Sequence, residues 1–237
     1  MHLFYAPDIE TTGMLPEEEA AHCLRVLRLQ EGDEIMLTDG RGHFFRGAIA
    51  GTGKRDVQID LLDRTDWQRS WACRLHLAVA PTKNMDRMEW LAEKATEVGL
   101  DEITFLACRF SERKAIKTER IRKILVSAMK QSQKALLPQV GEMQSFRDFM
   151  KADRPGRKLI AHCHEGQKAP IQQVLQKGDE ACTLLIGPEG DFSPEEVQTA
   201  LACGYEAVSL GASRLRTETA ALTGITLLNL LNPAQNL

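Results

Sequence analysis

The sequence has no long hydrophobic run and no leader-like N-terminus. A membrane-spanning helix needs about 20 consecutive apolar residues, and no stretch of this chain approaches that length. Its first residues also lack the basic segment followed by an apolar segment that marks a secretory signal peptide. We therefore expect no membrane segment and no signal peptide.

The cysteines lack any regular spacing: six are scattered along the chain, and no two form a C-x-x-C pair. This distribution favours free thiols in a reducing cytosol over disulfides or a zinc site, so we expect a cytoplasmic protein. In the densest ligand cluster, strand alternation would place His162 and His164 on one face and Cys163 on the other. We expect no metal site.

Three common motifs are also missing. The chain has no G-x-G-x-x-G fingerprint, no G-x-x-x-x-G-K-[ST] loop and no G-x-S-x-G elbow. These absences argue against a dinucleotide-binding Rossmann domain, a P-loop NTPase and an α/β-hydrolase.

Positive charge is concentrated rather than abundant. The net charge is −3, yet residues 109–134 contain nine basic and two acidic residues, and residues 1–70 contain eight basic and thirteen acidic ones. A basic segment inside a nearly neutral protein can form a phosphate-binding face. The alternative is a solvated helix surface, and charge alone does not decide between them.

Residues 1–70 predict a small β-rich domain. Strands are expected over residues 34–38, 43–50 and 57–62, and Asp39-Gly40-Arg41-Gly42 is a strong hairpin signal between the first two. A helix is expected to begin at Pro16, because three glutamates follow it. A meander of this length indicates a compact barrel. Residues 63–73 have the composition of a linker.

From residue 74 onward, expected strands alternate with expected helices. Strands are indicated over residues 75–80, 103–107, 158–163, 183–186 and 207–210, with helices at 82–98, 121–134 and after Ser193. This order predicts an open, mostly parallel α/β sheet over residues 74–237.

Two stretches near the C-terminus share one pattern: a short apolar run, a glycine-containing loop and a strong helix start. In the first, the loop from Gly187 to Gly190 is followed by the capping box Ser193-Pro194-Glu195-Glu196. In the second, the loop from Gly211 precedes an apolar helix over residues 220–231. Loops at the carboxyl ends of neighbouring parallel strands are the usual ligand position in such sheets.

These two stretches also carry a resemblance. Gly187-Pro188-Glu189-Gly190-Asp191-Phe192-Ser193-Pro194 and Leu215-Arg216-Thr217-Glu218-Thr219-Ala220 resemble the signatures of the RsmE family, the 16S ribosomal RNA uridine-N3 methyltransferases of the SPOUT superfamily. His22-Cys23-Leu24-Arg25-Val26-Leu27-Arg28-Leu29, Lys94-Ala95-Thr96-Glu97-Val98-Gly99 and Ser111-Glu112-Arg113 extend the resemblance over nearly the whole chain. Leu3 departs from it, because the family carries an arginine near this position.

The resemblance implies a PUA-like RNA-binding barrel over residues 1–70 and a SPOUT domain with a C-terminal trefoil knot over residues 74–237. It implies S-adenosylmethionine as cofactor and a homodimer as the usual assembly. The residues it places around the cofactor are Glu165, Ile186, Gly187, Pro188, Gly190, Leu210, Gly211, Leu215, Arg216 and Thr217.

The resemblance also implies 16S ribosomal RNA as substrate, presented by the assembled small subunit. Candidate RNA contacts are Arg25, Arg28, Arg113, Arg120, Arg122 and Lys123. Arg25 and Arg28 are three residues apart, so on a helix they would share a face. Their alternative role is to solvate that helix.

Methylation at uridine N3 requires loss of the N3 proton, which leaves negative charge on the uracil. We expect Arg216 to stabilise that charge or to hold the phosphate of the target nucleotide. A carboxylate could act as the base if burial raised its proton affinity. Glu189, Glu218 and Glu97 are candidates that the sequence does not rank. Equally, Glu218 can serve the helix dipole and Thr217 can be the N-cap.

The sequence therefore predicts an S-adenosylmethionine-dependent rRNA uridine-N3 methyltransferase. Three alternatives remain: a SPOUT enzyme acting on another RNA or acceptor atom, a non-catalytic RNA-binding relative, and an α/β enzyme that uses another nucleotide, which stronger binding of NAD than of S-adenosylmethionine would support. The identity of the modified nucleoside would distinguish the first alternative from the predicted enzyme. Failure to bind S-adenosylmethionine would favour the second alternative.

Overall fold

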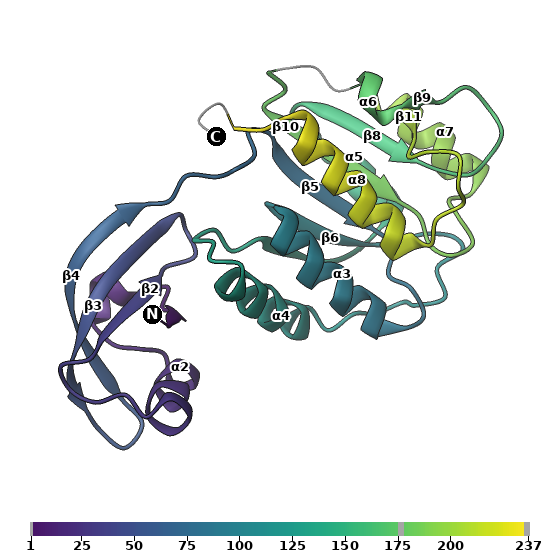
Figure 1. The fold of residues 1–237 in the computed structure, drawn as a ribbon. Coiled ribbons are helices and arrows are strands. Elements are labelled where there is room, and N and C mark those ends of the chain that lie inside the picture. Colours follow the sequence, from purple (N-terminus) through teal and green to yellow (C-terminus); the bar gives the residue numbers. More distant parts are fainter. Residues whose placement is uncertain (1, 175–177, 235–237) are drawn as a thin grey trace. The chain divides into compact units, whose positions relative to one another are not determined.

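The computed structural model describes residues 2–174 and 178–234 and divides the chain into two compact units (Figure 1). The N-terminal unit comprises residues 1–68 and 126–137, and the C-terminal unit comprises residues 69–125 and 138–237. Residues 1, 175–177 and 235–237, which belong to the expected domains 1–70 and 74–237, lie outside the described residues. The limits of these two domains stay a prediction. No helix in the described ranges is long and apolar enough to cross a membrane.

A four-stranded sheet forms the centre of the N-terminal unit, in the order β1-β2-β3-β4. Strands β1 and β2 are parallel, and β2, β3 and β4 pair antiparallel. In chain order, the elements of residues 1–68 are β1 (Leu3–Tyr5), α1 (Ile9–Thr12), α2 (Glu17–Ala21), the π-helical turn η1 (His22–Leu27), β2 (Glu34–Thr38), β3 (His43–Thr52) and β4 (Val57–Asp66).

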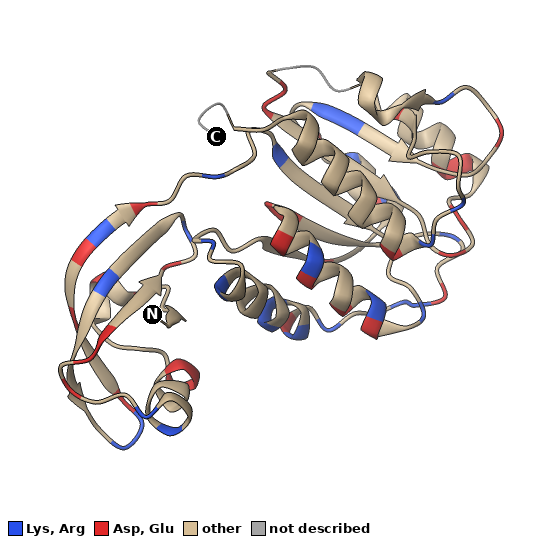
Figure 2. Ribbon diagram, viewed as in Figure 1, with Lys and Arg blue, Asp and Glu red and all other residues tan. Residues whose placement is uncertain are grey.

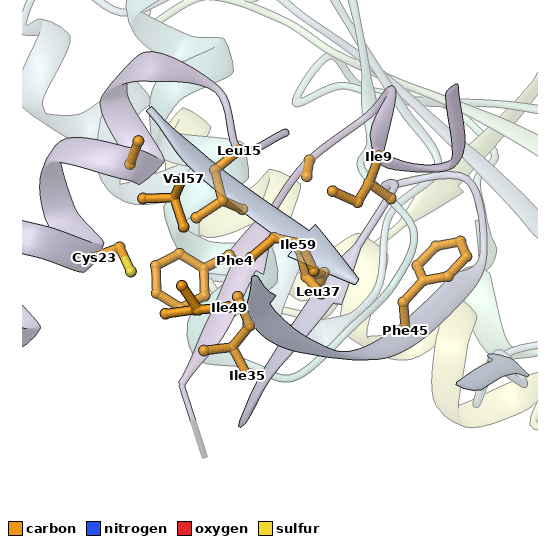
Figure 3. Packing of buried hydrophobic residues seen from close by; sticks show 12 residues of the cluster. Phe4, Ile9, Leu15, Cys23, Ile35, Leu37, Phe45, Ile49, Val57 and Ile59 are labelled. Atoms are coloured by element: carbon orange, nitrogen blue, oxygen red, sulfur yellow. The ribbon is translucent and has the colours of Figure 1, made fainter. Parts of the chain in front are cut away.

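The expected hairpin between β2 and β3 is confirmed, and the Asp39 carboxylate holds it. Its Oδ1 accepts from the backbone nitrogens of Arg41 and His43 at 2.7 and 3.2 Å. Gly40 and Gly42 adopt φ values of 72° and 109°, which glycine takes without steric cost. Buried apolar side chains from the strands, among them Phe4, Leu37, Phe45 and Ile59, pack beneath the sheet (Figure 3).

The segment with Arg25 and Arg28 differs from the expected helix. Residues 22–27 form a π-helical turn, and Arg28 ends it in the left-handed conformation at φ 55°. The prediction that the two arginines share one face of a helix is therefore wrong, because Arg28 is not helical.

Residues 126–137, which include the C-terminal part of α4 (Thr118–Gln131), belong to the N-terminal unit. The Lys130 ammonium pairs with the Glu19 carboxylate at 2.5 Å, and the Leu137 nitrogen donates to the Gly40 carbonyl at 2.9 Å. The local sequence gives no sign of these contacts, because both partners lie about a hundred residues away.

The C-terminal unit contains a seven-stranded sheet in the order β7-β6-β5-β10-β8-β11-β9, and all its pairings are parallel, as predicted. Its elements, with α4 running on into the N-terminal unit, are β5 (Arg74–Val79), α3 (Met85–Val98), β6 (Glu102–Ala107), α4 (Thr118–Gln131), β7 (Gln139–Ser145), α5 (Phe146–Lys151), β8 (Arg157–Ala161), β9 (Ala169–Pro170), α6 (Ile171–Val174), β10 (Ala181–Ile186), α7 (Pro194–Ala202), β11 (Glu206–Ser209) and α8 (Thr217–Leu231).

Helices cover the sheet through apolar contacts. Helix α8 packs against α3, β5 and β10, and the buried residues Phe149, Phe192 and Val197 join α5 and α7 to the sheet (Figure 1). At its end, α8 returns to the beginning of the unit, where the Ala72 nitrogen donates to the Asn232 carbonyl at 3.0 Å. The capping box at Ser193 is present as predicted.

Asp101 anchors the chain where it enters the C-terminal unit. Its carboxylate accepts from the Arg69 guanidinium, the Trp71 indole and the Leu75 nitrogen at 2.8, 2.8 and 2.9 Å. The expected linker 63–73 is wrong at its start, because β4 extends to Asp66. Strands β1, β7 and β9 were not expected, and α8 begins at Thr217 rather than Ala220.

His76 on β5 gives a pH-dependent stability. Burial lowers the pKa of its imidazole to about 3, with Arg154 and Arg74 adding to the effect although the Glu102 carboxylate lies 3.5 Å away. The unfolded chain binds a proton at this histidine below pH ~6.5, whereas the folded protein does not, so stability falls as the pH falls.

Between pH 7 and pH 5 this histidine should lower the free energy of unfolding by about 1–2 kcal/mol. Urea unfolding of the wild type and of His76→Gln at both pH values measures it as the difference between their pH dependences. Equal pH dependence in the two proteins would contradict the assignment.

Candidate functional site

A cavity of about 370 Å³ lies where β8, β10 and β11 of the C-terminal unit end. Because the three strands are parallel neighbours, their carboxyl ends meet at one edge of the sheet. The cavity is lined by Ala161, His162, Cys163, Ile186, Gly187, Pro188, Glu189, Asp191, Leu210, Gly211, Ser213, Arg214, Leu215, Arg216, Thr217 and Ala220.

Most of the residues expected at a cofactor site line this cavity. They are Ile186, Gly187, Pro188, Leu210, Gly211, Leu215, Arg216 and Thr217. Glu165 and Gly190 are not among the lining residues: Glu165 is exposed, and Gly190 lies against Phe110. The two glycine loops thus meet at one site, as the sequence predicts.

The start of α8 is tied to the loop after β10. The buried Thr217 hydroxyl donates to the Gly187 carbonyl at 3.1 Å. Arg216, not Thr217, occupies the N-cap position, so the N-cap alternative for Thr217 is wrong. Thr217 instead fixes the distance between the two glycine loops.

Asp191 ties the same loop to the end of β8. Its Oδ2 accepts from the Cys163 nitrogen at 2.7 Å, and its Oδ1 accepts from the Phe192 nitrogen at 2.8 Å. It adopts a φ of 67°, a conformation that aspartate tolerates better than most residues. The residues predicted from the sequence do not include this carboxylate.

Two side chains of the loop after β8 hold this loop in place. The Lys168 ammonium donates to the carbonyls of His162 and His164 at 3.1 and 2.7 Å, and His164 Nε2 donates to the Phe192 carbonyl at 2.6 Å. Burial lowers the pKa of His162, so its imidazole at the cavity wall is neutral near pH 7. Within the described residues, no group of three or more His, Cys, Asp or Glu side chains could hold a metal ion.

The three candidate carboxylates differ in position. Glu189 lines the cavity, and its Oε1 accepts from the Lys83 nitrogen at 2.9 Å. Glu218 is buried outside the cavity lining and faces the Arg87 guanidinium at 3.6 Å. Glu97, on α3, pairs with the Lys94 ammonium at 2.8 Å. Of the three, the structure brings only Glu189 to the cavity.

Two arginines at the cavity wall are charged but unpaired. Arg214 and Arg216 are exposed, and neither guanidinium lies within ion-pair distance of a carboxylate in the part of the chain that the structure describes. Among the described residues, an anionic group that enters the cavity would therefore meet two guanidinium groups with no ion-pair partner, although the Glu189 and Asp191 carboxylates also line the cavity.

Comparison with known proteins assigns the family. Residues 69–229 match the RNA methyltransferase domain family, and residues 15–62 match an RNA methyltransferase PUA domain. The chain belongs to the RNA methyltransferase family. The ribosomal RNA small subunit methyltransferase E of Bacillus subtilis is 30% identical to it, over 92% of this chain and 88% of the relative.

Solved structures agree with this assignment. A probable rRNA-methyltransferase from Porphyromonas gingivalis is 44% identical and superposes with a TM-score of 0.91, covering 98% of both chains. Ribosomal RNA small subunit methyltransferase E from Neisseria gonorrhoeae, bound to S-adenosyl methionine, is 27% identical, with a TM-score of 0.87 and 98% coverage of both chains.

The basic residues of residues 109–134 differ in whether other groups of the protein occupy their side chains. The Arg113 guanidinium donates to the carbonyls of Thr82 and Lys83, and Arg120 forms a two-bond ion pair with the Glu89 carboxylate. Arg122 and Lys123 are exposed on α4, where Figure 2 shows several basic positions. Net charge in this segment therefore overstates the charge left for a ligand.

In the N-terminal unit, Arg25 lines a hollow of about 210 Å³ together with Lys54 and Arg55. Glu17 also lines it and pairs with Arg55 at 3.4 Å. Arg28 is exposed and is not among the lining residues. The structure thus separates the two arginines and gives Arg25 new basic neighbours from the turn between β3 and β4.

Asp191 generates a direct prediction. Asp191→Gly keeps the left-handed backbone accessible but removes both carboxylate acceptors. The Cys163 amide should then exchange with solvent about 10–100 times faster, since a hydrogen bond to a charged group contributes roughly 1.5–3 kcal/mol. Hydrogen-exchange mass spectrometry of the segment around Cys163 measures this effect.

Asp153→Gly is the matched control, because Asp153 is exposed and lies away from the cavity lining. It should leave the exchange of Cys163 unchanged. Equal exchange in wild type and Asp191→Gly would mean that the loop after β8 does not depend on this carboxylate.

Proposed function

We propose that this protein transfers a methyl group from S-adenosylmethionine to N3 of a uridine in 16S ribosomal RNA, on the assembled small subunit. One observation carries the proposal. The two glycine loops of an RNA methyltransferase domain enclose a cavity whose wall holds the unpaired guanidinium of Arg216. The relatives named above as small subunit methyltransferases support the substrate, and the one bound to S-adenosyl methionine supports the cofactor.

The cavity fits such a cofactor in size and chemistry. Its volume of about 370 Å³ is within the range of small-molecule sites. Ile186, Leu210 and Leu215 offer apolar contact to an adenine ring, and Gly187 and Gly211 leave backbone groups accessible for hydrogen bonds to its edge. In our proposal these residues, with Pro188 and Thr217, hold the cofactor, while Glu165 and Gly190 support the surrounding loops.

When bound, S-adenosylmethionine supplies an electrophilic methyl group, and the protein prepares the uracil to receive it. We assign to Arg216 the stabilisation of the negative charge that develops on the uracil when N3 loses its proton. Glu189 is the proposed acceptor of that proton, because it is the candidate carboxylate at the cavity. Glu218 then acts structurally, through its ion pair with Arg87.

RNA binding is divided, in our proposal, between the two parts of the chain. Residues 1–70 form a PUA-like β-barrel that contacts phosphates through Arg25, aided by Lys54 and Arg55 in the same hollow. Residues 74–237 form the catalytic domain, with Arg122 and Lys123 as further phosphate contacts. Arg28 joins them as an exposed cation, whereas Arg113 and Arg120 organise the protein itself.

We also infer a C-terminal trefoil knot. In support, β10 lies between β5 and β8, and the loop after β11 is tied to the loop after β10 by Thr217. We further infer a homodimer in the cytoplasm, where small ribosomal subunits are found. Exposed Trp90 on α3 and Leu230 on α8 support the dimer, because these helices contact each other and present apolar side chains to solvent.

The function is tested with unmodified small subunits, naked 16S ribosomal RNA and labelled S-adenosylmethionine, followed by nucleoside analysis. We expect label as 3-methyluridine at one site of the assembled subunit. Label on another nucleoside or RNA would replace the substrate and keep the enzyme class. Absence of label with bound cofactor would indicate an inactive relative.

Arg216→Ala tests the proposed catalytic role. It should lower kcat by about 100-fold or more, as loss of one charge-stabilising donor does, while the Kd for S-adenosylmethionine changes by less than about 3-fold. Methyl transfer assays and calorimetry measure the two quantities. Arg147→Ala, which removes an exposed arginine from α5, serves as control. Equal losses of binding and turnover would contradict the role given to Arg216.

A further inference from the structure

Phe110 is an aromatic residue with no role in the proposed cofactor binding or methyl transfer. It follows β6, and 47% of its surface is exposed. Single exposed apolar side chains are common on protein surfaces and need no function by themselves. The position and support of Phe110 distinguish it.

Phe110 lies against the loop that forms one wall of the cavity. A Cβ atom at Gly190 would be 3.1 Å from the Cβ of Phe110 and 3.8 Å from its Cγ. Because glycine has no side chain, the two backbones can approach this closely. The neighbours of Gly190 on both sides, Glu189 and Asp191, line the cavity, so Phe110 packs against the loop that forms its wall without lining the cavity itself.

The turn that carries Phe110 is held in place by hydrogen bonds. The Ser111 nitrogen donates to the Cys108 carbonyl at 3.1 Å, and the Cys108 nitrogen donates to the Ser111 hydroxyl at 3.0 Å. The Arg109 nitrogen donates to the Glu196 carboxylate at 2.8 Å, which fastens the turn to α7. The backbone that carries Phe110 is therefore held in place, which reduces the backbone entropy lost when a partner binds there.

The exposed cations next to Phe110 fit an anionic partner. Arg109 and Lys114 are exposed on either side of the turn, and the exposed Glu112 carboxylate beside them pairs with the Lys83 ammonium at 3.0 Å. Single-stranded nucleic acid matches this pairing of an accessible aromatic face with nearby cations, because its bases stack on aromatic rings while its phosphates meet positive charge.

We propose that Phe110 is a stacking surface for an unpaired nucleobase of the substrate RNA, next to the nucleotide that enters the cavity. This positioning role rests on the proposed function. It places RNA along the turn at residues 108–111, where the ring aligns the strand before methyl transfer. Phe110 does not contact the reacting atoms, so it should affect substrate binding more than turnover.

The test compares Phe110→Ala, Phe110→Tyr and wild type in methylation of unmodified small subunits. Phe110→Ala should raise KM for the subunit about 10–100-fold, in keeping with the loss of one base-aromatic stack, with little change in kcat. Phe110→Tyr should retain near wild-type KM because it keeps the ring. Leu201→Ala, which removes a side chain 45% exposed on α7, should have no effect.

Two further measurements separate the possible failures. The Kd for S-adenosylmethionine should be the same in Phe110→Ala and wild type, and a large increase would overturn the proposal in favour of support for the cavity loop. Light scattering should give equal masses, and dissociation of Phe110→Ala would mean that a second copy of the chain covers the ring. An unchanged KM in an active enzyme would overturn the stacking role alone.

A binding measurement makes the test independent of activity. The fluorescence that Phe110→Trp adds over wild type should be quenched by a single-stranded oligouridylate and not by polyphosphate. Quenching supports stacking even if the small subunit proves not to be the substrate. Absence of quenching would overturn it.

Discussion

Hydrogen bonds between the backbone and two side chains, Asp191 and Thr217, connect the loops that form the walls of the cavity. The parallel sheet brings the ends of β8, β10 and β11 to one edge, but the loops beyond them have no strand partners. Asp191 joins the loop after β10 to Cys163, and Thr217 joins the loop after β11 to Gly187. The bond from His164 Nε2 to the Phe192 carbonyl is a second connection between the loops after β8 and β10. The shape of the site therefore depends on specific side chains rather than on the sheet alone.

Features encoded within a few residues could be predicted from the sequence. The capping box at Ser193, the end of α3 at Gly99 and the Asp39 hairpin all follow local rules, and all are present. Features that depend on distant partners could not. The transfer of residues 126–137 to the N-terminal unit rests on contacts such as that between Lys130 and Glu19, and no local pattern encodes them.

The same distinction explains the site. The glycine loops can be recognised from their composition, so most of the residues expected at the cofactor site do line the cavity. Asp191 was missed because its partner at Cys163 is 28 residues away, although an aspartate just after a glycine loop is a possible signal for such a bond. Glu218 is one of three candidate bases that the sequence does not rank. Its side chain faces Arg87 on α3, a direction that only the packing of the two helices determines.

Pairing, rather than net charge, also decides how an acidic protein can act on RNA. Arg113 and Arg120 contribute to the basic count of their segment, yet carbonyl oxygens and the Glu89 carboxylate occupy their guanidinium groups. Arg214 and Arg216 lie at the cavity with no carboxylate in ion-pair distance among the described residues. Since a neighbouring carboxylate reduces the attraction of a cation for phosphate or for an anionic base, the unpaired residues at the site matter more for RNA than the net charge of the chain suggests.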